Sequence, residues 1–217
     1  MLNFSPRWSG LALAIAGILF GTFMFFHPSN DAQGAMNPLW TPVHVMWFVS
    51  YLLILLGLNA FPVNLGDEVG RLGFTAYLLS FLGTALSLPI AVWDSFIVPY
   101  LAVHAPEMIE QIEESSLETP VLTFRIVFFL TVITFSLGFL LLGVSLLRMH
   151  LLLRVAGGLL MIGAPLFWMG AIVFSKGSLS NVVTIIGAVF FGAGLVLLGY
   201  CLWSKFEKLV ATASSIR

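Results

Sequence analysis

Long apolar runs separated by short polar stretches make up most of this chain of 217 residues. A helix that spans a bilayer needs about 20 mainly apolar residues, because the hydrocarbon core is about 30 Å thick. Six runs reach this length. They predict spanning helices at residues 8–26, 43–61, 72–93, 121–147, 155–174 and 182–203. We therefore expect an all-α fold in which residues 1–217 form a single transmembrane bundle of six helices.

The third apolar run is longer than one straight span, since it stays apolar from Leu72 almost to His104. Pro89 and Pro99 offer places for a kink or an end, because proline lacks a backbone N–H and clashes with the preceding turn. We expect the span to end near Trp93, and the rest of the run to lie at the interface or to dip back into the bilayer. The run is too short for a second full span, so six helices are preferred to seven.

Lysine and arginine are concentrated on one side of the predicted bundle. That side carries Arg7, Arg71, Arg148, Arg154, Lys205, Lys208 and Arg217. The opposite side carries Lys176, with Arg125 just inside the fourth span. Short cytoplasmic loops are enriched in Lys and Arg, so we expect both termini in the cytoplasm. We call the arginine-rich end the inner end and the opposite end, with the long loops 27–42 and 94–120, the outer end.

Composition supports a membrane protein and excludes several classes of function. Charged residues make up 9% of the chain, whereas soluble domains carry roughly 25%. The net charge of -1 provides no basic field for nucleic acid, so the expected partners are the lipid bilayer and a membrane protein or a second copy of the chain. The one cysteine, Cys201, excludes an intrachain disulfide and a thiolate metal site. Compact loops are typical of a bacterial inner membrane protein, which is the location we expect.

Ionisable residues gather at the outer ends of the predicted spans. His27, His44, Asp94, His104 and Arg125 fall at similar depth, although charged groups at membrane depth are costly. Neutral imidazole is the commonest metal ligand, and a hydrogen bond usually orients its second nitrogen. The cluster therefore predicts a divalent metal held by His27, His44, Asp94 and His104. Alternatively, two of the three histidines are axial ligands of a haem b.

Asp94 and Arg125 are expected to act together. Either charge alone would be costly near the membrane, and a hydrogen-bonded pair is less so. The two residues would then tie the third span to the fourth, or Arg125 would hold an anion that Asp94 orients. The sequence contains no HExxH, ExxH or CxxCH motif, so we assign no enzymatic reaction.

Three functions are consistent with these residues. The first is an outer-face site for haem, a metal or a small ligand, with a redox role. The second is a non-catalytic membrane subunit or scaffold, for which the GxxxG pattern of Gly17 and Gly21 offers a close helix contact; packing within the bundle explains that pattern equally. The third is a carrier for a lipophilic or small neutral solute, with Asn59 and Ser87 lining its cavity.

Overall fold

The computed structural model describes residues 6–109, 119–172 and 178–215, and all regular elements in this part of the chain are helical. The long helices are α1 (Pro6–Phe23), α3 (Trp40–Leu58), α4 (Phe61–Val92), α7 (Thr119–Leu146), α8 (Leu151–Ile172) and α9 (Ser178–Ser215). The short elements are the 3-10 turn η1 (Met24–Phe26), α2 (Ala32–Ala35), the π-helical turn η2 (Trp93–Ile97) and α5 (Val98–His104). Within the described ranges, six helical stretches are long and apolar enough to cross a membrane. The predicted all-α bundle of six spans is confirmed.

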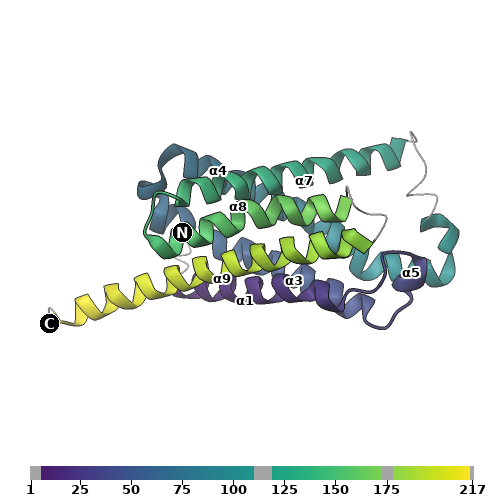
Figure 1. Cartoon of the computed structure of the whole chain (residues 1–217), viewed down its shortest axis with the longest axis horizontal. Coiled ribbons are helices and arrows are strands. Elements are labelled where there is room, and N and C mark those ends of the chain that lie inside the picture. The colour runs from purple at the N-terminus through teal and green to yellow at the C-terminus, as the bar shows by residue number, and fades with distance from the viewer. Residues whose placement is uncertain (1–5, 110–118, 173–177, 216–217) are drawn as a thin grey trace.

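The six long helices form a closed ring in the order α1, α3, α4, α7, α8 and α9, with α9 packed back against α1. Helix α1 begins and α9 ends at the same end of this bundle, whereas α5 lies at the opposite end (Figure 1). A chain that crosses the bundle an even number of times begins and ends at the same end. The end that carries α5 is the outer end defined above.

Aromatic side chains fill the centre of the ring. Phe20 of α1 contacts the rings of Tyr51, Phe167 and Phe191, with centroids 5.8, 4.9 and 4.8 Å away. Phe135 of α7 contacts Tyr51 and Phe191 in turn, and all five side chains are buried. Each such pair contributes about 0.5–1.5 kcal/mol beyond area burial. The aromatic core therefore holds five of the six long helices, α1, α3, α7, α8 and α9, in one packed unit.

Helices α1 and α9 approach each other closely through glycines. Gly17 and Gly21 of α1 face Gly192 of α9, where an added Cβ would lie 2.8 Å from the Cα of Gly21. Real Cβ atoms are not found that close to backbone, so glycine is required at this crossing. The GxxxG pattern therefore serves packing within the bundle.

The third span does not break at its prolines. Helix α4 ends at Val92, but the chain stays helical through η2 and α5. In η2 the N–H of Val98 bonds to the carbonyl of Trp93, five residues back, which leaves the carbonyl of Asp94 free. The next carbonyl, of Ser95, lacks its usual α-helical donor as well, because Pro99 has no N–H to give to it.

Helix α3 supplies the donors that these two carbonyls lack. Trp40 Nε1 donates to the carbonyl of Asp94 at 2.7 Å, and Thr41 Oγ1 donates to the carbonyl of Ser95 at 3.2 Å. Unpaired backbone groups are costly at membrane depth, and irregular backbone is tolerated there only when neighbouring groups pair with it. The irregular turn is thus stabilised from outside its own helix, which allows one helical path where the sequence predicts an end.

Candidate functional site

Two of the predicted site residues, His27 and His44, contact each other at the outer end of the bundle. Their Nε2 atoms lie 3.2 Å apart and their ring centroids 4.8 Å apart. His27 follows η1 directly in an extended conformation, as expected for a residue before proline. His44 lies one turn inside α3, and its side chain is buried. We call these two residues the histidine pair.

A backbone carbonyl holds the other ring nitrogen of each histidine. His27 Nδ1 donates to the carbonyl of Pro28 at 2.6 Å, and His44 Nδ1 donates to the carbonyl of Trp40 at 2.8 Å. A carbonyl can only accept, so each Nδ1 carries a proton and each Nε2 of a neutral ring carries a lone pair. Two such lone pairs on nitrogens 3.2 Å apart repel each other. A cation bound by both nitrogens would remove this repulsion.

A metal ion suits this geometry better than a shared proton. Burial lowers the pKa of the His27 imidazole below its ordinary value, which disfavours the charged ring, and the hydrogen bond to Pro28 only partly opposes the shift. The two ring centroids lie 4.8 Å apart. If the rings were aligned end to end with their Nε2 atoms 3.2 Å apart, the centroids would be further apart than this. A shared proton prefers a straight N–H···N arrangement, whereas the donors of a tetrahedral metal meet at an angle.

Trp40 fixes the histidine pair relative to η2. Its ring lies 4.3 Å from that of His44 and 5.4 Å from that of His27, measured between centroids. The same indole donates to the backbone of Asp94. Sequence reasoning missed this role of Trp40, and the signal that could have found it is the four-residue spacing to His44, which puts both residues on one face of the helix.

The other predicted site residues have different surroundings. Asp94 meets the site through its backbone carbonyl, which accepts a hydrogen bond from Trp40. His104 is exposed; its Nδ1 donates to the Tyr100 carbonyl at 2.9 Å and its ring stacks on that tyrosine. Arg125 lies near the start of α7 and is partly buried. Its pairing with Asp94 stays a prediction.

The structure does not support the four-residue metal set of His27, His44, Asp94 and His104. In the described ranges, no three His, Cys, Asp or Glu side chains are grouped so that they could hold a metal ion. The histidine pair by itself offers two ligands. A haem held between His27 and His44 does not fit, because axial ligands approach the iron from opposite faces of the macrocycle and these two rings are in direct contact.

The two polar residues of the carrier hypothesis are satisfied by their own helices. Ser87 is fully buried and its hydroxyl donates to the carbonyl of Gly83. Asn59 is exposed, and its amide donates to the carbonyl of Leu55. Neither side chain requires a polar cavity, and the carrier function stays a prediction.

Three buried donors below the histidine pair were not predicted. Trp47 Nε1, Tyr51 Oη and Trp168 Nε1 make no hydrogen bond of regular geometry to the described residues, although the side chains of Ser87 and Trp47 lie beside the Tyr51 hydroxyl. Trp47 contacts His44 on one side and Tyr51 and Trp168 on the other, with centroids 6.2, 5.2 and 6.3 Å away. Aromatic residues in an apolar helix look like packing residues in the sequence, which is why these donors carried no signal.

In comparisons with known proteins, no family model, no curated protein and no solved structure matches this chain, so its function is inferred from the residues themselves.

Proposed function

We propose that this membrane protein binds a divalent transition-metal ion at its outer end, through His27 Nε2 and His44 Nε2. The observation that carries the proposal is the 3.2 Å approach of these two nitrogens while both Nδ1 atoms donate to backbone carbonyls. Metal-ligating histidines usually donate their second N–H in this way, which fixes the tautomer and the orientation of the ring. Imidazole suits ions of zinc, copper, iron and nickel.

The separation of the two nitrogens supports a metal of this class. Two nitrogens bound to one tetrahedral ion at about 2.0 Å each lie about 3.3 Å apart, which is close to the 3.2 Å between the histidines. Binding would therefore require little movement of α1 or α3. The remaining coordination positions would be open to water or to a solute from the outer side. Open positions are typical of catalytic sites, whereas structural sites are closed by protein ligands.

Metal titration of the purified protein tests this function. The protein in mild detergent is stripped with a chelator, and Zn²⁺ binding is measured by calorimetry, with Co²⁺ absorption as a second signal. We expect one ion per chain. His27→Ala and His44→Ala should each lower the affinity by at least about 100-fold, since even changes behind the ligands cost about 10–100-fold.

The other two histidines of the chain provide matched controls. His104→Ala removes an exposed histidine at the same end of the bundle, and His150→Ala removes the one at the inner end. Both variants should bind Zn²⁺ as the native protein does. Circular dichroism and gel filtration would show that the four variants are equally folded. Native binding that survives His44→Ala in a folded protein would disprove the site.

A further inference from the structure

The bend in α4 forms a pocket of about 370 Å³ at the inner end of the bundle, opposite to the histidine pair. Gly70 has φ 60° and ψ −157°, so the helix before it points away from the helix after it. Glycine adopts this combination at little cost, and other residues essentially do not. The pocket lies in the angle of the bend, and its size falls in the range of about 300–1,000 Å³ that ligand sites occupy.

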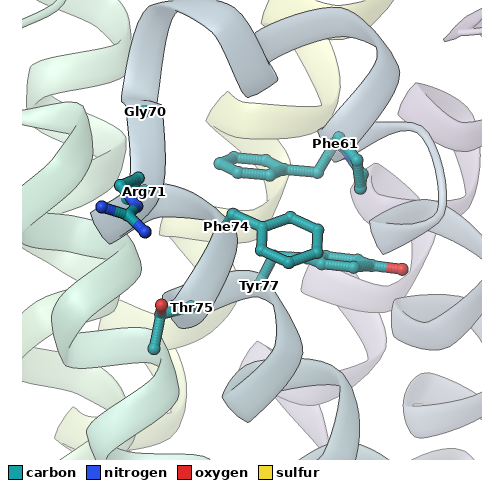
Figure 2. Close-up of a pocket in the computed structure, with 7 residues that line it drawn as sticks. Phe61, Gly70, Arg71, Phe74, Thr75 and Tyr77 are labelled. Atoms are coloured by element: carbon teal, nitrogen blue, oxygen red, sulfur yellow. The ribbon is translucent and has the colours of Figure 1, made fainter.

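One wall of the pocket consists of aromatic rings. Phe61, before the bend, and Tyr77, after it, are parallel to within 7° with centroids 6.3 Å apart. Phe74 lies against Tyr77 at 6.2 Å. Figure 2 shows Phe61 over the other two rings, with Arg71 and Thr75 to one side. The aromatic wall therefore brings together two segments of α4 that the bend separates.

The other side of the pocket carries a positive charge and a hydroxyl. Arg71 and Thr75 are both exposed, and both line the pocket. They lie four residues apart, which puts them on the same face of the helix. A guanidinium and a hydroxyl are donors that together suit a phosphate group, and arginine matches phosphate geometry particularly well.

The position of the pocket in the membrane and the exposed apolar surface beside it indicate a lipid rather than a soluble ligand. Arg71 lies at the start of the third membrane span, where the headgroup layer begins. From the pocket, an exposed apolar strip continues along α4 through Phe74, Leu78 and Leu82, which are 51%, 49% and 49% exposed. A four-residue spacing keeps these side chains on one face. The strip leads from the charged group toward the middle of the bilayer.

We propose that this pocket binds one anionic phospholipid of the leaflet at the inner end. Arg71 and Thr75 hold its phosphate, the aromatic wall contacts the glycerol and upper chain carbons, and one acyl chain lies along Leu78 and Leu82. The site is independent of the histidine pair. The bend at Gly70 places Arg71 at the depth of the phospholipid headgroup, and the apolar strip along α4 lies at the depth of the acyl chains.

Native mass spectrometry of the full-length protein tests the proposal. The protein is titrated with phosphatidylglycerol and, separately, with phosphatidylcholine of the same chain length. Both lipids carry the phosphate, but phosphatidylcholine also carries a choline cation that Arg71 repels. One phosphatidylglycerol should therefore be retained with an affinity about 10-fold above that for phosphatidylcholine. Arg71→Ala should remove this preference. Arg148→Ala, which removes another exposed arginine of the inner end outside the pocket, should keep it.

Two further measurements separate the lipid from other occupants. Phe74→Ala should weaken the binding of both lipids, because the apolar wall contacts a part that they share. Inorganic phosphate at millimolar concentration should not displace phosphatidylglycerol. Displacement by phosphate would assign the pocket to a soluble phosphate compound and overturn the proposal. Equal retention of the two lipids by the native protein, or an equal loss in Arg71→Ala and Arg148→Ala, would overturn it as well.

Discussion

The indole nitrogen of Trp40 donates a 2.7 Å hydrogen bond to the backbone carbonyl of Asp94, which lies 54 residues further along the chain. This carbonyl is available because, in the π-helical turn η2, the N–H of Val98 bonds to the carbonyl of Trp93 and not to that of Asp94. The donor belongs to the residue whose ring and carbonyl both contact His44. The irregular turn of the third span and the histidine pair are therefore parts of one structural unit.

Trp40→Phe should destabilise this unit. The variant keeps an aromatic ring beside His44 but leaves the Asp94 carbonyl without its donor, which costs about 1–3 kcal/mol for a buried group. Thermal unfolding in detergent should show a lower Tm, and Zn²⁺ affinity should fall because the histidine pair is held less firmly. Trp8→Phe is the control, since Trp8 is 61% exposed on α1. Equal Tm values for the two variants would show that the hydrogen bond is not a significant support.

The hydroxyl of Tyr51 presents the opposite case. It is fully buried and makes no hydrogen bond of regular geometry to the described residues, although the side chains of Ser87 and Trp47 lie beside it. Its ring contacts Phe20 and Phe135. Tyr51→Phe keeps these contacts and removes a donor whose burial without a partner costs about 1–3 kcal/mol. The variant should be as stable as the native protein or more stable. A fall in Tm as large as that of Trp40→Phe would mean that the hydroxyl has an acceptor after all.

The sequence predicted the number and the approximate position of the spans because the bilayer requires long apolar helices. Helix η2 was not predictable in the same way. Pro89 and Pro99 each remove a backbone hydrogen bond within the third span. Judged from the sequence around them alone, they favour a break in the helix. The donors that stabilise the continuous path belong to Trp40 and Thr41 on another helix, and a single sequence carries no record of that contact.

The candidate site was predicted in part for a related reason. A topology gives the depth of a residue in the membrane, and from it His27, His44 and His104 are expected at one end of the bundle. Depth does not give the direction in which a side chain points around the ring of helices. His27 and His44 meet because α1 packs on α3, whereas His104 turns to Tyr100 of its own helix.

Gly70→Ala tests the bend in α4. An added Cβ at Gly70 would meet open space, so the cost of the variant comes from the backbone conformation alone. A φ of 60° with ψ of −157° costs an L-residue about 1–3 kcal/mol. Gly158→Ala is a matched control, because a Cβ there also meets open space but the glycine lies within α8. It should stabilise the protein by about 0.5–1 kcal/mol.

The two glycine variants should therefore shift Tm in opposite directions. Gly70→Ala should also weaken phosphatidylglycerol retention, because the pocket depends on the angle that this residue permits. Gly158→Ala should leave lipid retention unchanged. If both variants raised Tm, the bend would not be a fixed feature of the folded protein.

The pH dependence of Zn²⁺ binding should reflect the buried position of His27. A proton and the metal compete for the same Nε2 lone pair, so binding weakens as the pH falls through the pKa that the imidazole has in the folded protein. Burial places that pKa below the ordinary value of 6.5. The apparent affinity should therefore begin to fall at a lower pH than it would for an exposed histidine, which would lose Zn²⁺ from about pH 6.5 downward. Calorimetric titrations on the His104→Ala variant would exclude a contribution from that exposed histidine, and a midpoint above 6.5 in this variant would contradict a desolvated histidine pair as the ligand.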